Sequence, residues 1–214
     1  MLEVSGLSAG YGRARVLFGI ELAARRGEVV ALLGRNGAGK STTLKAIMGL
    51  VPPLSGEVRF EGKRIDGREP HEIARLGLGY VPEDRRIFTD LTVVENLAVG
   101  RQPPRADAPS WTTEGLLALF PALSRMLERP GGRMSGGEQQ MLCIARTLAG
   151  NPKAILLDEP SEGLAPLVAE QMARVILELK RSGVTVLLAE QSARFTGRVA
   201  DRAYTLEKGQ LAPA

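Results

Sequence analysis

The segment from Gly34 to Ser41, which reads Gly-Arg-Asn-Gly-Ala-Gly-Lys-Ser, constrains the fold of this 214-residue chain more than any other. It matches the pattern G-x-x-x-x-G-K-[ST], which has structural meaning only between a strand and a helix. The short apolar run from Glu28 to Leu33 precedes it, and a helical stretch from Lys40 to Leu50 follows it. The segment therefore predicts a strand, a tight glycine-rich turn and a helix, which is the central unit of an α/β fold.

The glycine-rich turn predicts a phosphate-binding site. Its glycines let successive backbone N–H groups point inward at phosphate oxygens, and the N-terminus of the following helix strengthens this anion site. Lys40 adds a positive charge for the β and γ phosphates, and Ser41 offers a hydroxyl oxygen to Mg²⁺, which prefers hard oxygen ligands. The alternative, a turn that binds nothing, is disfavoured by the Lys-Ser pair directly after the last glycine.

Strand and helix patterns alternate in the rest of the chain. Ala154 to Leu157 and Val184 to Ala189 are apolar runs typical of buried parallel strands. The helix expected between them repeats apolar residues on one face, namely Val168, Met172, Val175 and Leu179. Three other segments alternate with period two and predict antiparallel strands: Leu2 to Leu7, Val16 to Leu22 and Gly56 to Phe60. We expect a parallel sheet covered by helices, with an antiparallel β subdomain beside it.

The middle of the chain has a different sequence pattern. From Thr92 to Arg146 it reads as helical segments interrupted by prolines, with no convincing strand. We expect one domain over residues 1–214, in which residues 92–146 form an inserted helical subdomain and residues 1–91 and 147–214 form the core with its β subdomain. The polar, Pro-rich stretch from Gln102 to Ser110 predicts a mobile surface loop, to which no function is assigned.

Two acids, Asp158 and Glu159, end the apolar run Ala154 to Leu157. A strand interior does not hold such charges, so they are expected at its exposed C-terminal edge, where open α/β sheets bind ligands. Asp158 is then placed to hold Mg²⁺, and Glu159 to polarise an attacking water. Two solvated acids before Pro160 are the alternative, which the phosphate-binding turn disfavours.

The segment Ser135-Gly136-Gly137-Glu138 begins a further helix, expected over Met141 to Leu148. Ser135 and Glu138 have the spacing of a capping box, in which each side chain bonds a free backbone N–H of the other. Glycine in the first turn of a helix costs about 1 kcal/mol relative to alanine. The pair of glycines therefore indicates that some group needs close access to the backbone there, as a phosphate at a helix N-terminus would.

These motifs together resemble the ATP-binding cassette family, the nucleotide-hydrolysing subunits of ABC transporters, over essentially the whole chain. The turn at 34–41, the signature Met134-Ser135-Gly136-Gly137-Glu138-Gln139 and the run Leu156 to Pro160 occur in the family's order, with Met134 in place of the usual leucine. The resemblance implies a P-loop NTPase fold in which two cassettes close head to tail around two ATP molecules. The loop from Ser161 to Ala165 would cross the dimer interface, and Ser135 to Gly137 would contact the γ-phosphate held by the opposite subunit.

The resemblance also implies a set of site residues, with ATP and Mg²⁺ as cofactors. Tyr11 would stack on adenine. The nucleotide-binding residues would be Tyr11, Val16, Gly34, Arg35, Asn36, Gly37, Ala38, Gly39, Lys40, Ser41, Thr42, Ser135, Gly136 and Gly137. The metal-binding residues would be Ser41, Glu83 and Asp158, and the catalytic residues Glu159, Gln191 and Glu83.

Two positions depart from the usual family pattern. Glu83 stands where a glutamine is usual, and Gln191 where a histidine is usual; the chain's only histidine, His71, is expected at the surface. Glu83 cannot donate as an amide does, and Gln191 can bond the γ-phosphate but cannot carry a proton. These forms are similar to the F-type ATPase of branched-chain amino acid importers, as are Glu83 to Phe88 and Ser161 to Pro166.

The expected function is therefore that of an importer ATPase that drives uptake of branched-chain or other hydrophobic amino acids. Its expected partners are a second ABC ATPase, as homodimer or heterodimer, and membrane permease subunits. The chain itself is expected in the cytoplasm, held at the inner face of the cell membrane through the permease. Urea or amide uptake, a soluble ABC ATPase acting on ribosomes or DNA, and a nucleotide-binding regulatory module with little turnover remain alternatives.

Composition excludes other classes of partner. The net charge is +4, but the basic residues are scattered and aromatic residues are only 4%, so we expect no nucleic-acid partner. No run reaches the ~18 apolar residues of a membrane span, so direct insertion into a membrane is not expected. The single Cys143 lies in an apolar helical stretch and is expected to be a small core residue.

Overall fold

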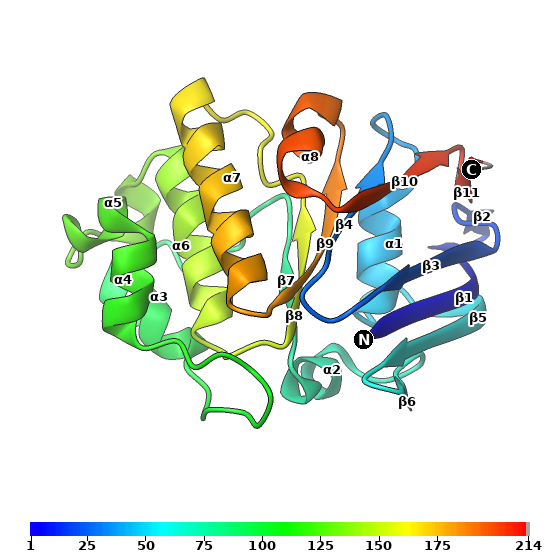
Figure 1. The fold of residues 1–214 in the computed structure, drawn as a ribbon, viewed down its shortest axis with the longest axis horizontal. Helices are drawn as coiled ribbons and strands as arrows, with labels where there is room; N and C mark the ends of the chain where they lie inside the picture. The colour runs from blue at the N-terminus through cyan, green and yellow to red at the C-terminus, as the bar shows by residue number, and fades with distance from the viewer. Residues whose placement is uncertain (213–214) are drawn as a thin grey trace.

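The computed structural model describes residues 1–212, and within this range the strands form two sheets (Figure 1). The six-stranded sheet has the order β11-β10-β4-β9-β8-β7 and is parallel except for β11. Its strands are β4 (Val29–Leu33), β7 (Leu78–Val81), β8 (Ala154–Asp158), β9 (Thr185–Glu190), β10 (Arg202–Glu207) and β11 (Gln210–Leu211). The antiparallel sheet consists of β1 (Leu2–Tyr11), β2 (Ala14–Arg15), β3 (Ile20–Ala24), β5 (Pro53–Phe60) and β6 (Lys63–Arg64).

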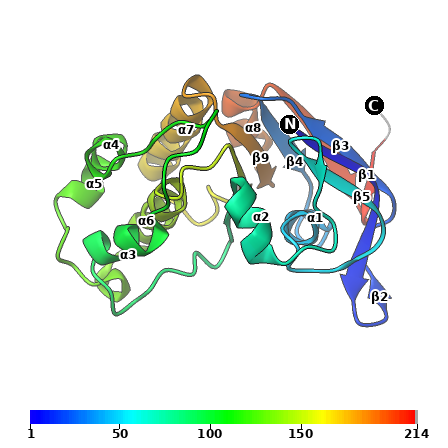
Figure 2. The same cartoon turned by 90° about the horizontal axis from the view of Figure 1, so that it is seen from below.

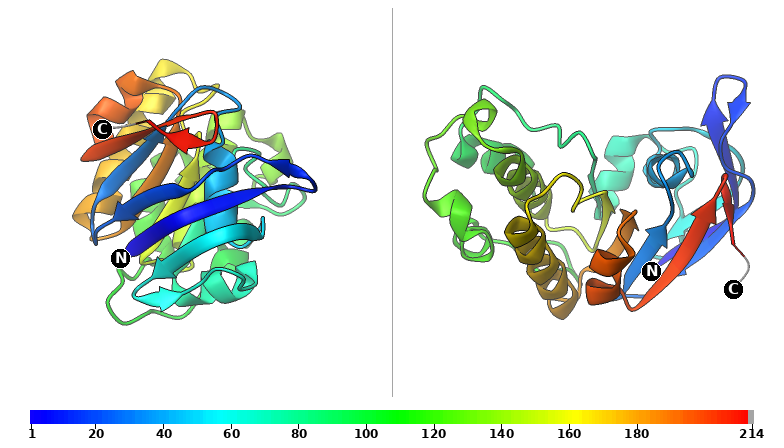
Figure 3. Two further views of the ribbon diagram at one scale, coloured as in Figure 1. Left: turned by 90° about the vertical axis from the view of Figure 1, so that its right-hand side faces the viewer. Right: turned by 90° about the horizontal axis from the view of Figure 1, so that it is seen from above.

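The helices cover the parallel sheet from both sides. They are α1 (Lys40–Ile47), α2 (Pro70–Leu76), α3 (Val93–Gly100), α4 (Thr113–Leu119), α5 (Pro121–Ser124), the short 3₁₀ helix η1 (Gly131–Arg133), α6 (Gly136–Leu148), α7 (Pro166–Arg181) and α8 (Ala193–Val199). Helix α1 packs against both sheets. Helices α3 to α6 lie at the end of the molecule opposite the antiparallel strands, as Figure 2 and Figure 3 show. No helix within residues 1–212 is both long enough and apolar enough to cross a membrane.

The apolar runs are buried on both faces because successive side chains of a strand point in opposite directions. In β8, Leu156 packs in the cluster that contains α1 and the antiparallel sheet, whereas Ile155 and Leu157 pack in the cluster that contains α6 and α7. The parallel sheet therefore separates two hydrophobic cores. This arrangement confirms the expected α/β fold, with a parallel sheet and antiparallel strands beside it.

Several element boundaries differ from the sequence expectations. The strand expected from Val16 begins only at Ile20, because Gly19 has a positive φ of 70° that interrupts the extended chain. The helix expected to reach Leu50 ends at Ile47, followed by Gly49 with φ 75°. Strands β7, β10 and β11 were not among the expected strands; β7 has only four residues and β11 two, and the alternating exposure of β10 was passed over.

The Pro-rich stretch from Gln102 to Ser110 is anchored rather than free. The Arg105 guanidinium donates to the carbonyl oxygens of Arg75 and Ala74 at the end of α2. Asn151 Nδ2 donates to the carbonyl oxygen of Gln102 over 2.8 Å, and the N–H of Trp111 donates to Asn151 Oδ1 over 2.7 Å. The expectation of a mobile loop overlooked these bonds, which come from side chains distant in sequence.

Candidate nucleotide-binding site

The glycine-rich turn curls around the side chain of Lys40, the first residue of α1. Lys40 Nζ donates to the carbonyl oxygens of Gly34, over 2.8 Å, and Arg35, over 3.2 Å. Gly39, which precedes the helix, has φ 111°, and a Cβ there would lie 2.8 Å from Leu17 Cδ2. Both the backbone conformation and the lack of space therefore require glycine at this position.

Lys40 also forms a buried ion pair with Glu159. Lys40 Nζ lies 2.8 Å from Glu159 Oε1, and the two side chains are only 4% and 5% exposed. Burial raises the pKa of the Glu159 carboxyl, and the bond from Lys40 opposes this shift. Glu159 has φ 48°, a left-handed conformation that is uncommon for residues other than glycine. The chain thus holds an acid in a strained conformation beside the phosphate-binding turn.

Asp158 ends β8 at the carboxyl edge of the sheet, as expected, but it is buried rather than exposed. Its carboxylate accepts a hydrogen bond from Ser41 Oγ over 2.9 Å and another from the Tyr80 hydroxyl over 3.2 Å. Burial raises the pKa of Asp158, and these two hydroxyl donors oppose the shift. The expectation of exposure was wrong because the first turn of α1 and the neighbouring strand β7 cover the acid and satisfy its oxygens.

A cavity of about 430 Å³ opens at this point, and half of the predicted residues line it. Its lining consists of Val16, Asn36, Gly37, Gly39, Lys40, Ser41, Thr42, Glu83, Glu159 and Glu162. Asp158, bonded to Ser41, lies behind this wall. Glu162 was not singled out as a site residue, although it belongs to the loop from Ser161 that was expected at the interface between subunits.

Tyr11 is not part of this lining. It is the last residue of β1, at the turn to β2, and is half exposed.

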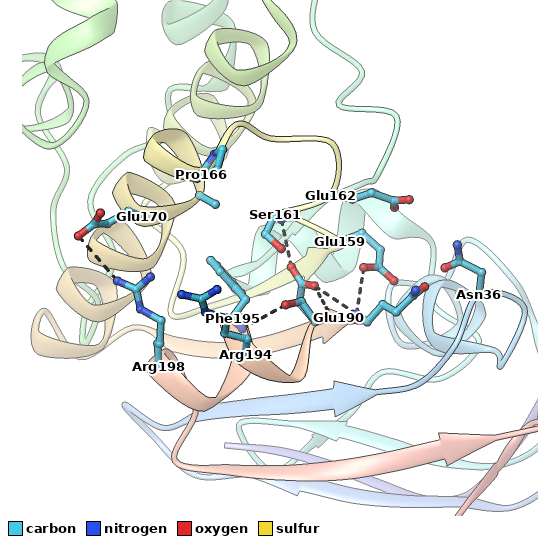
Figure 4. A pocket seen from close by; sticks show the side chains of 13 residues that line it. Asn36, Glu159, Ser161, Glu162, Pro166, Glu170, Glu190, Arg194, Phe195 and Arg198 are labelled. Atoms are coloured by element: carbon cyan, nitrogen blue, oxygen red, sulfur yellow. Dashed lines mark hydrogen bonds and ion pairs between the residues drawn. The ribbon is translucent and has the colours of Figure 1, made fainter.

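Glu190 is a further buried acid, and sequence reasoning did not assign it a role. It ends β9, is 1% exposed, and accepts hydrogen bonds from the N–H groups of Ser161, Gln191 and Ser192. The N–H of Gln191 also donates to Glu159 Oε2 over 3.2 Å. Figure 4 shows Glu159, Ser161 and Glu190 together at one side of a neighbouring cavity of about 570 Å³. An acid directly after an apolar strand, the pattern that identified Asp158, was the signal that could have found Glu190.

The predicted capping box begins α6. Glu138 Oε2 accepts from the N–H of Ser135 over 2.7 Å, and Ser135 Oγ accepts from the N–H of Glu138 over 3.4 Å. Both glycines lie inside the first turn of α6, as the capping box at Ser135 predicted.

The two glycines of this turn have close neighbours within their own chain. A Cβ on Gly136 would lie 2.9 Å from an Arg85 guanidinium nitrogen, and a Cβ on Gly137 would lie 3.0 Å from Val168 Cγ1. Neither Ser135 nor these glycines line the cavity around Lys40. The chain therefore presents the two glycine-rich segments separately.

Three comparisons place the chain among known proteins. A family model described as "ABC transporter" matches residues 17–162. The high-affinity branched-chain amino acid transport ATP-binding protein BraG of Pseudomonas aeruginosa is 44% identical over 99% of this chain and 91% of its own length. The probable branched-chain amino acid transport ATP-binding protein LivF of Archaeoglobus fulgidus is 36% identical over 99% of this chain and 90% of its own length.

A solved structure shows the same fold. It is the dimeric post-hydrolysis state of the ATP-binding cassette MJ0796 bound to ADP and Pi, which superposes with a TM-score of 0.84 at 25% identity and covers 100% of this chain and 97% of that one. Cassettes of this fold therefore form dimers. The chain belongs to the ABC transporter family and is one of its ATP-hydrolysing cassettes.

Proposed function

We propose that this chain is the ATPase subunit of an importer and couples ATP binding and hydrolysis to the uptake of branched-chain or other hydrophobic amino acids. The observation that carries the ATPase is the buried pair of Lys40 and Glu159 beside Asp158, at the mouth of the glycine-rich turn. The transported substrate is supported by BraG and LivF, whose names assign them to branched-chain amino acid transport and which match this chain over nearly its full length.

The residues present fit ATP with Mg²⁺. The turn from Gly34 to Thr42 would hold the phosphates through its inward N–H groups and Lys40. Ser41, Asp158 and Glu83 would hold Mg²⁺, since hydroxyl and carboxylate oxygens are the hard ligands that it prefers. Within residues 1–212, no group of three or more histidine, cysteine or acidic side chains is arranged to hold a metal ion by itself. Phosphate oxygens and water would complete the coordination. Bound there, Mg²⁺ would neutralise charge on the phosphates.

The protein groups around this site then have distinct roles. Glu159 would orient the attacking water, with its carboxylate held between Lys40 Nζ and the N–H of Gln191. The Gln191 side chain would bond the terminal phosphate without carrying a proton. Glu83 would add negative charge at the cavity wall, where the family usually has a neutral amide. Both departures change the electrostatics around the site and leave the phosphate-binding turn intact.

A second subunit would complete the site. Ser135 to Gly137 lie outside the cavity around Lys40, so these residues would act on the nucleotide of an opposing cassette, in a homodimer or a heterodimer. Tyr11, which is half exposed, would stack on adenine at the outer edge of the site. We further propose that residues 92–146 act as the helical subdomain that transmits the movement to permease subunits at the cytoplasmic face of the membrane.

Phosphate release by the wild type and by Glu159→Gln tests the ATPase. We expect the variant to lose at least about 100-fold in turnover while it still binds ATP, because the amide keeps the shape of the side chain but cannot act as a base. Both proteins should be assayed alone and with a partner cassette. Glu3→Gln, at an exposed position of β1, is the matched control and should keep wild-type turnover. If the wild type shows no turnover either alone or with a partner cassette, the proposed mechanism is wrong.

The substrate requires a separate experiment. The chain should be reconstituted in proteoliposomes with its co-purifying permease and solute-binding protein, and ATP-dependent uptake of labelled leucine compared with that of labelled urea. We expect uptake of leucine. Uptake of urea alone would contradict the proposed substrate and leave the ATPase assignment intact.

A further inference from the structure

Tyr80 is a second hydroxyl donor to Asp158, and no motif singles it out. It lies on β7, which pairs in parallel with β8, and is level there with Leu156. Its hydroxyl reaches past this position to Asp158 Oδ2 over 3.2 Å, while Ser41 Oγ bonds Oδ1 over 2.9 Å. Each oxygen of this fully buried carboxylate therefore has its own hydroxyl partner, one from α1 and one from β7.

The two partners differ in what else they do. Ser41 lines the cavity and is itself a proposed ligand of the metal. Tyr80 does not line that cavity, and its ring faces a groove of about 650 Å³ that Met48, Leu50 and Phe88 also line. Its hydroxyl therefore bonds Asp158 from outside the cavity around Lys40. Groups that bond a ligating carboxylate from behind fix its orientation and tune its affinity for metal.

We propose that Tyr80 is a positioning residue for the divalent cation. Its hydroxyl holds the Asp158 carboxylate in the orientation in which Oδ1, the oxygen bonded to Ser41, can face the metal. The inference rests on the proposed function of the site. Without the Tyr80 hydroxyl, Asp158 Oδ2 would be buried with no hydrogen-bond donor from β7, and the carboxylate would be free to turn.

Tyr80→Phe isolates this hydroxyl, since the ring and its packing remain. Tyr204→Phe is the matched control, because the Tyr204 hydroxyl on β10 bonds Arg202 and the N–H of Ala23, away from the site. Binding of Mn²⁺, a substitute for Mg²⁺, should be measured by the loss of the free-ion electron paramagnetic resonance signal. The titration uses full-length protein in excess over a non-hydrolysable ATP analogue, and the Mn²⁺ bound by the same analogue without protein is subtracted. Binding of the same analogue in EDTA reports whether the phosphate-binding turn is intact.

We expect Tyr80→Phe to weaken Mn²⁺ binding about tenfold. Analogue binding in EDTA should stay at the wild-type level, and Tyr204→Phe should match the wild type in both measurements. Mn²⁺ binding by Tyr80→Phe equal to that of the wild type would overturn the inference. So would an equal loss of analogue binding in EDTA, because Tyr80 would then support the fold of the site rather than Asp158. Wild-type protein that binds no Mn²⁺ with the analogue would overturn the proposed function instead, and the inference with it.

Discussion

The charged residues of this protein form two groups that differ in burial. At the carboxyl edge of the parallel sheet, Lys40, Asp158, Glu159 and Glu190 are almost fully buried, and each has a polar partner. Removing one partner of a buried ion pair leaves the other charge buried without a partner, so such pairs contribute little net stability. We infer that this protein keeps its buried charges for function. Elsewhere, charges pair near the surface and contribute modestly to stability.

Glu28 and Arg202 form an ion pair of the second, near-surface group. This pair predicts that the free energy of unfolding depends on pH. Arg202 Nε donates to Glu28 Oε1 over 2.6 Å, and this bond is the main cause of the lowered pKa of Glu28. Because the folded-state pKa lies below the unfolded value, the stabilisation is present above about pH 4.5 and is lost as the pH falls through the folded pKa. We expect Glu28→Gln to lower the free energy of unfolding by about 1 kcal/mol at neutral pH.

Urea denaturation of wild type and Glu28→Gln at several pH values measures this difference. The two curves should converge as the pH falls through the lowered folded-state pKa of Glu28. A difference that stays constant between neutral pH and this range would show that Glu28 acts through packing and not through its charge.

The sequence predicted residue roles well where the chemistry is local. The turn from Gly34 to Ser41 contains its own glycines, lysine and hydroxyl, so its residues could be named without knowledge of the fold. Tyr80 could not, because its partner Asp158 is brought to it by strand pairing. The burial of Asp158 was missed for the same reason, since Tyr80 covers it from another strand.

At the scale of helices and strands, local signals again gave the best predictions. The capping box at Ser135 was read from four residues and is present, whereas the start of β3 depended on the conformation of Gly19. Glycines within helices show the same contrast. The helix propensity of glycine is a local property, whereas the space around its Cα depends on residues that are distant in sequence. Gly100 ends α3 directly against α6, and Gly115 lies exposed in α4.

Alanine at these two positions should have opposite effects on stability. A Cβ on Gly100 would lie 2.2 Å from the carbonyl oxygen of Arg146, so we expect Gly100→Ala to destabilise the protein by about 2 kcal/mol. The nearest neighbour of a Cβ on Gly115 is 3.4 Å away, so Gly115→Ala should gain about 0.5 kcal/mol from helix propensity. Thermal or urea unfolding of both variants checks the pair. An equal stabilisation in both would show that α3 and α6 can separate at no cost.

The segment from Gln102 to Ser110 links two elements that are distant in sequence. Arg105 carries a positive charge to the C-terminal end of α2, where free carbonyl oxygens and the helix dipole favour a cation. We expect Arg105→Ala to release this contact. Amide hydrogen exchange should then become faster in residues 101–110 and in the last turn of α2, with a loss of about 1 kcal/mol in stability. Arg125→Ala, at an exposed position after α5, should leave exchange in both segments unchanged.

In the whole molecule, the fold places the two glycine-rich segments apart from each other. The turn that encloses Lys40 lies between β4 and α1, while Ser135 to Gly137 begin α6 and lie outside the same cavity. A single chain therefore presents two separate glycine-rich surfaces. In a head-to-tail pair related by a two-fold axis, each surface would face the complementary one of the partner, so the same contact would occur twice, as in any isologous interface.

This arrangement predicts that ATP controls the association of the subunits. With Glu159→Gln, which should bind ATP without hydrolysing it, we expect light scattering after size exclusion to show twice the mass of the free chain in ATP and a monomer in ADP. ATP then stabilises the dimer by its preference for the closed state. Lys40→Ala in the same background removes the phosphate charge partner and should stay monomeric in ATP. If the natural pair is a heterodimer, the shift in mass should appear when a second, different cassette is added. A monomer in ATP under both conditions would mean that Ser135 to Gly137 serve only to begin α6, where Arg85 and Val168 already account for the two glycines.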